Sequence, residues 1–125
     1  MGKKILLAVA KALALDLEKM VRQWGFDILK AHDGQEVFEL AQEERPVLII
    51  LERNLPVLDG MSVTVLLKDH PDTKSIPIVA ICEGRCAQDQ EKARDAGCDA
   101  YLSRPVNSGE LKSIITKFLS SEVAT

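Results

Sequence analysis

Glu52 directly follows the apolar run Val47–Leu51, which is predicted to be a buried strand. In a parallel sheet, ligands and reactive groups gather at the carboxyl ends of the strands. An aspartate at such a point could act as a well-held phosphoryl acceptor beside a metal ion. A glutamate carries its carboxylate further out on a longer stem, so the residues around Glu52 decide which chemistry remains.

The other predicted strand ends bring more side chains to the same edge of the sheet, namely Val9, Ala10, Cys82 and Arg104. Arg104 has a planar guanidinium that can bind a carboxylate through two hydrogen bonds. We therefore hypothesise an ion pair between Glu52 and Arg104. The alternative is that both side chains point into solvent, where such a pair contributes only about 0–1 kcal/mol.

The elements that position these residues follow from hydrophobic periodicity, because short apolar runs alternate with segments whose apolar residues recur every three or four positions. The predicted strands are Ile5–Val9, Asp27–Ala31, Val47–Leu51, Ile78–Cys82 and Ala100–Leu102. The predicted helices are Leu13–Trp24, Gly34–Glu43, Met61–Lys68, Gln88–Ala96 and Ser108–Leu119. This alternation predicts an α/β fold with a parallel sheet covered by helices on both faces.

Composition indicates one domain, residues 1–125, with its core in 3–119 and a loose tail over 120–125. The net charge is −3 and the basic residues are scattered, so neither nucleic acid nor an anionic membrane is an expected partner. No apolar stretch reaches the roughly 20 residues that cross a bilayer, and we expect a cytoplasmic protein. Cys82, Cys86 and Cys98 form no CxxC pair, so we expect neither a disulfide framework nor a zinc site.

Five stretches, in order and at family spacing, resemble the receiver domain of two-component response regulators: KKILL, GFDILKAHDGQEVFELA, VLIILERNLPVLDG, IPIVAI and AGCDAYLSRPV. The resemblance covers residues 3 to about 119. It implies a flavodoxin-like (CheY-like), doubly wound, five-stranded sheet in the order 2-1-3-4-5. It also implies a switch position at Tyr101 and a cis bond before Pro105.

The same resemblance implies a metal-binding acid pair, a phosphoryl-accepting aspartate, a hydroxyl residue and a lysine. This chain has other residues at all of these positions: Val9 and Ala10, Glu52, Cys82 and Arg104, respectively. Mg²⁺ needs oxygen ligands, so we expect its binding to be lost. Phosphoryl transfer depends on such electrostatic stabilisation, and we expect no enzymatic activity and no cofactor.

Three residues keep alternative interpretations. Glu52 could mimic a phosphorylated aspartate, although one planar carboxylate copies a tetrahedral dianion poorly. Cys82 is either a redox-sensitive thiol or an inert buried residue, and the second interpretation is favoured because low-pKa cysteines lie near positive charge. Tyr101 is either a mobile switch or a fixed, half-buried ring.

Apolar residues without an evident core role predict a surface for a protein partner. Val65 and Leu66 lie off the core-facing side of their helix. The stretch from Ala8 to Leu15 is also apolar and is a second candidate for such a surface. The alternative, favoured more here than for Val65 and Leu66, is that Val9 and Ala10 collapse into the vacated pocket and Leu15 packs on a neighbouring helix.

The sequence therefore predicts a pseudo-receiver that signals through protein contacts without phosphorylation. The alternative is a phosphorelay receiver that still docks a histidine kinase or phosphotransferase, as a decoy or an unconventional phosphoacceptor. A downstream effector and a weak homodimer stay open as partners. A flavodoxin-type cofactor binder is disfavoured because AVAKALAL has no Ser/Thr/Gly loop to hold phosphate.

Overall fold

The computed structural model describes residues 3–82 and 87–119. Five parallel strands form one sheet in the order β2-β1-β3-β4-β5, as expected. The strands are β1 (Lys4–Ala8), β2 (Asp27–Lys30), β3 (Leu48–Glu52), β4 (Ile78–Cys82) and β5 (Ala100–Ser103). The predicted loose tail over 120–125 and Cys86, for which no disulfide or zinc role was expected, lie outside the described residues.

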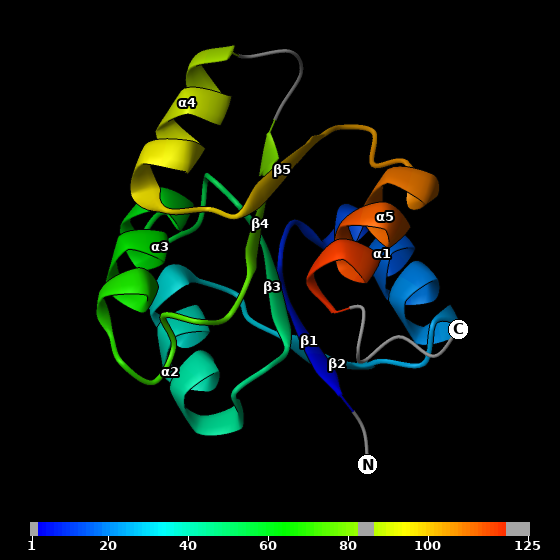
Figure 1. The fold of residues 1–125 in the computed structure, drawn as a ribbon, viewed down its shortest axis with the longest axis horizontal. Helices are drawn as coiled ribbons and strands as arrows, with labels where there is room; N and C mark the ends of the chain where they lie inside the picture. The colour runs from blue at the N-terminus through cyan, green and yellow to red at the C-terminus, as the bar shows by residue number, and fades with distance from the viewer. Residues whose placement is uncertain (1–2, 83–86, 120–125) are drawn as a thin grey trace.

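A helix follows each strand, and together the helices cover both faces of the sheet (Figure 1). They are α1 (Lys11–Gln23), α2 (Gly34–Glu44), α3 (Gly60–Asp69), α4 (Ala87–Ala96) and α5 (Ser108–Phe118). Helices α1 and α5 lie on one face, and α2, α3 and α4 lie on the other. None of the described helices is long and apolar enough to span a membrane.

Strand alternation divides the core into two clusters, because successive side chains of a strand point to opposite faces. The α1/α5 cluster includes Ile5 and Leu7 of β1 and Leu48 and Ile50 of β3, and the α2/α3/α4 cluster includes Leu6, Ala8, Ile49 and Leu51. The central strands are buried on both faces, which explains their unbroken apolar runs.

Several element ends differ from the predicted ones by one or two residues. Helix α1 begins at Lys11 rather than Leu13, and β3 includes Glu52 as its last residue. The start of α1 was missed because its N-cap, Ala10, has no side chain that could signal a cap. By contrast, Asp33 caps α2, Asp59 caps α3 and Asn107 caps α5, each accepting a backbone N–H with its side chain.

Candidate functional site

The carboxyl ends of β1, β3, β4 and β5 meet at one edge of the sheet, as the parallel register requires. Ala8 is level with Leu51, Glu52 with Ile81, and Cys82 with Ser103. One residue further, the backbone N–H of Arg104 donates to the Cys82 carbonyl at 3.1 Å. The edge thus brings together Val9, Ala10, Glu52, Cys82 and Arg104, as the sequence predicts.

Glu52 accepts hydrogen bonds from two distant parts of the chain. Its Oε1 accepts the backbone N–H of Ala10, and its Oε2 contacts Nη2 of Arg104. Successive side chains of β3 point to opposite faces of the sheet. Glu52 therefore points to the same face as Leu48 and Ile50, which is the face covered by α1 and α5. The Glu52 side chain is 13% exposed and that of Arg104 is 33% exposed, so water only partly screens this ion pair.

The loop after Glu52 is held close to the strand at Gly60. The N–H of Gly60 donates to the Arg53 carbonyl at 2.7 Å, and a Cβ on Gly60 would lie 2.3 Å from the Glu52 carbonyl oxygen. Only glycine permits that approach without moving backbone, so this position supports the backbone of the strand end that carries Glu52.

The residues at the acid-pair positions carry no side-chain oxygen. Val9 is half-buried and packs against the α1/α5 cluster, whereas Ala10 is exposed. The expected collapse of both residues into a pocket is therefore wrong for Ala10, whose backbone N–H is used instead. The expected packing of Leu15 on a neighbouring helix is also wrong, because its position on α1 turns it outward and leaves it 54% exposed.

The remaining predicted positions lie on β4, on β5 and just after it, and on α3. Cys82 is buried at the end of β4, and Tyr101 is half-buried against the α2/α3/α4 cluster. The Arg104–Pro105 bond is cis. Val65 and Leu66 lie on α3 and are 52% and 41% exposed.

A second thiol, Cys98, lies beneath α3. It is 3.7 Å from Thr64 Oγ1, and burial raises its pKa to about 11, with the Thr64 hydrogen bond acting in the opposite direction. This environment keeps the sulfur protonated, so Cys98 has the character of a packing residue.

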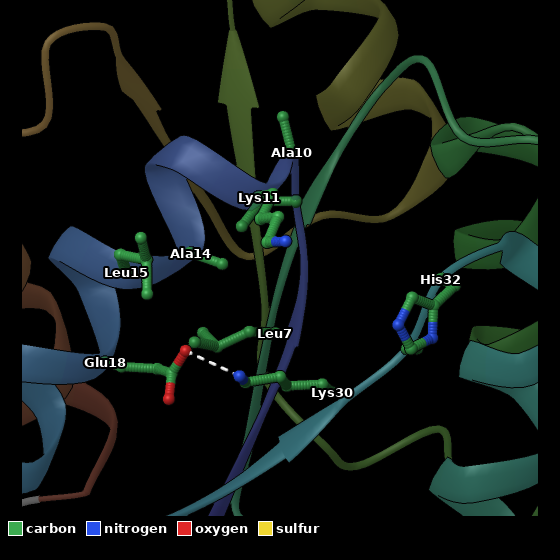
Figure 2. A pocket seen from close by; sticks show the side chains of 10 residues that line it. Leu7, Ala10, Lys11, Ala14, Leu15, Glu18, Lys30 and His32 are labelled. Atoms are coloured by element: carbon green, nitrogen blue, oxygen red, sulfur yellow. Dashed lines mark ion pairs between the residues drawn. The ribbon is translucent and has the colours of Figure 1, made fainter.

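Sequence reasoning missed a cavity of about 500 Å³ beside the first turns of α1 (Figure 2). Its polar lining includes Lys11, Glu18, Lys30 and His32. The Lys30 ammonium, 2.8 Å from the Glu18 carboxylate, lowers the pKa of that carboxyl, and the Arg22 charge acts in the same direction against desolvation. Lys30 and His32 could have been found from the sequence, because they lie at the carboxyl end of a predicted strand. No local pattern in the sequence pairs Glu18 with Lys30.

Comparison with known proteins identifies the family of this domain. The model of the response regulator receiver domain matches residues 10–116. The polar-differentiation response regulator DivK of Brucella anthropi is 30% identical over 120 residues, which cover 95% of this chain and 98% of that protein.

Two solved structures share the fold. The receiver domain of the sensor histidine kinase PA1611 from Pseudomonas aeruginosa, with a magnesium ion coordinated in its active site cleft, has a TM-score of 0.88 and 28% identity, covering 96% of this chain and 99% of that one. A putative response regulator from Chloroflexus aurantiacus has a TM-score of 0.91 and 24% identity, covering 96% of this chain and 99% of that one.

Proposed function

Because this chain belongs to the response regulator receiver domain family, we propose that it is a pseudo-receiver, a module that signals through protein contacts without magnesium-dependent phosphorylation. One observation carries the proposal: the Glu52 carboxylate is already engaged by the Ala10 N–H and the Arg104 guanidinium. A carboxylate held in this way has little free capacity for a metal ion or a phosphoryl group.

The donor set around Glu52 does not fit Mg²⁺. This ion requires nearly octahedral oxygen coordination and binds proteins through carboxylates and waters. Val9 and Ala10 supply alkyl groups at the positions where the family places acids, and no cluster of three or more His, Cys, Asp or Glu suited to a metal occurs in residues 3–82 and 87–119. Arg104 adds a positive charge, which disfavours a cation further.

Family membership alone does not decide between a phosphorylated and an unphosphorylated mode of action. The PA1611 receiver coordinates magnesium in its cleft, so a related chain keeps the site that we propose is lost here. Phosphoryl transfer depends on charge stabilisation and positioning. We therefore propose that this domain has no enzymatic activity and needs no cofactor.

Acetyl phosphate with millimolar MgCl₂, followed by intact-protein mass spectrometry, tests this proposal. We expect the wild-type chain to gain no phosphoryl group. The positive control is the combined variant Val9→Asp, Ala10→Asp, Glu52→Asp and Arg104→Lys, which restores the residue types of the family at these four positions. Phosphorylation of wild-type Glu52 would contradict the proposal.

Thermal unfolding in MgCl₂ gives an independent test of magnesium binding. A ligand that binds only the folded state raises the melting temperature, so we expect MgCl₂ to leave thermal unfolding of the wild type unchanged relative to matched NaCl. The combined variant should be stabilised by MgCl₂ once its carboxylates are restored.

A protein partner is the second part of the proposal, and Val65 and Leu66 on α3 are its candidate contact residues because they are exposed and apolar. The Val65→Ser and Leu66→Ser pair should lose partners that the wild type recovers from native cell extract, while retaining its melting temperature.

A phosphorelay receiver that still docks a histidine kinase or phosphotransferase is the second candidate. Leu15 on α1 favours it, because this residue is exposed and lines one cavity together with Val9 and Ala10. Loss of partner recovery in Leu15→Ser, but not in the α3 double variant, would support this alternative. The cytoplasmic location expected from the sequence remains a prediction.

A further inference from the structure

The cavity beside α1 has the size and lining of a small-molecule site. Its volume of about 500 Å³ lies within the range of roughly 300–1,000 Å³ typical of ligand pockets. It lies between the first turns of α1 and the carboxyl ends of β1 and β2 (Figure 2). Leu7, Ala14 and Ala31 form a buried apolar floor, and Leu15 adds an exposed apolar wall. Such a lining favours an apolar ligand body.

The charges around the cavity leave one ammonium group unmatched. Glu18 is paired with Lys30 at 2.8 Å and with Arg22 at 3.7 Å, so this carboxylate is already neutralised. In residues 3–82 and 87–119, no hydrogen bond or ion pair engages the Lys11 side chain. Lys11 also opens α1, whose first turn contains no acidic residue. The end of the cavity near Lys11 is therefore positively charged.

His32 faces an acidic side chain of its own. Its Nδ1 lies 3.1 Å from Glu36, and its backbone N–H donates to the same carboxylate at 2.8 Å. This acidic neighbour offsets any charge on the ring, so Lys11 remains the cation that a ligand would meet.

We propose that this cavity binds a small monocarboxylate with an apolar body. The carboxylate lies against the Lys11 ammonium, and the body packs over Leu7, Ala14 and Leu15. A phosphate dianion suits the site less well, because phosphate recognition uses several converging donors such as a bidentate arginine. Glu52 is not among the lining residues, but Ala10, whose backbone N–H donates to Glu52, is one of them. The proposed site therefore adjoins the ion pair and does not include it.

Octanoate is the probe, and backbone amide shifts in two-dimensional ¹H–¹⁵N NMR are the measurement. We expect saturable shifts at Lys11, Ala14, Leu15 and Ala31, with a dissociation constant of about 1 mM or tighter for a ligand of this size. Octanamide, which has the same length but no charge, should bind about tenfold more weakly. Rising NaCl should weaken octanoate binding and leave octanamide binding unchanged.

Two matched lysines of α1 separate a specific contact from general charge. Lys11→Gln should weaken octanoate binding about tenfold, whereas Lys19→Gln should leave it unchanged, because Lys19 is exposed on the same helix but does not line the cavity. Melting temperatures of both variants show whether each is folded.

Several results would overturn the proposal. They are an absence of saturable shifts up to about 10 mM octanoate, shifts centred on α3, equal affinity for octanamide, and equal losses in the two lysine variants. Inorganic phosphate that binds as tightly as octanoate and depends on Lys11 would replace the monocarboxylate with a simple anion.

Discussion

At the scale of single residues, Glu52 acts as a connector between two strand ends and the start of a helix. Its oxygens accept one donor from the β1–α1 junction and one from the segment after β5. Removing either charge leaves the other partly buried and unmatched, which costs more than the intact pair contributes.

A charge-reversal cycle measures this connection. Glu52→Lys and Arg104→Glu should each lower the free energy of unfolding by about 1–3 kcal/mol, and the double variant should recover much of that loss. Urea unfolding of the four proteins gives the coupling energy. Strictly additive losses would show that the two side chains do not stabilise each other.

The protonated state of Cys98 leads to a chemical prediction. With its pKa raised to about 11 by burial, this thiol should react with iodoacetamide at about pH 8 roughly 100-fold more slowly than the same cysteine in the unfolded chain. Peptide mapping by mass spectrometry reports each cysteine separately. Equal rates in the native and denatured protein would contradict the assignment.

At the scale of elements, the loop between β3 and α3 is packed directly against the start of α2. The Gly34 N–H donates to the Pro56 carbonyl at 3.1 Å, and a Cβ on Gly34 would lie 1.9 Å from the Leu58 carbonyl oxygen. The loop that follows Glu52 is therefore supported by a helix that precedes it in the chain.

Gly34→Ala should lower the free energy of unfolding by about 1–3 kcal/mol, because the added methyl group forces backbone apart. Gly109→Ala is the matched control in the first turn of α5, where the nearest atom is the Asn107 side-chain oxygen at 3.1 Å. Its effect should stay within about 1 kcal/mol. Equal effects on urea unfolding would show that the α2 contact is unimportant.

The starts of some helices could be predicted from the sequence more closely than those of others. The capped helices α2, α3 and α5 begin at or within one residue of their predicted starts, because Asp33, Asp59 and Asn107 mark them chemically. Helix α1 begins two residues before its prediction because Ala10 carries no such mark.

At the scale of the whole molecule, the pair formed by Glu18 and Lys30 links α1 to β2 at one edge of the sheet. The folded-state pKa of Glu18 lies below its unfolded value. A carboxyl with a lowered pKa contributes stability above its unfolded pKa and loses that contribution as pH falls through the folded value.

Glu18→Gln should therefore lower the melting temperature at neutral pH, and the difference from wild type should shrink as the pH falls through the lowered folded-state pKa of Glu18 and the wild-type carboxyl becomes protonated. Glu43→Gln, at an exposed glutamate of α2, serves as the control. A difference that persists unchanged at acid pH would assign the effect to packing rather than charge.

The amino-acid sequence by itself determined the order of strands and helices, the parallel sheet and the edge at which Glu52, Cys82 and Arg104 meet. Periodicity and strand ends are local properties, so they can be read from neighbouring residues. Only the tertiary structure decided that the backbone N–H of Ala10 reaches Glu52, that Leu15 turns outward, and that Glu18 and Lys30 border a cavity. These features depend on how α1 lies across the sheet, and that placement results from packing between segments far apart in the chain.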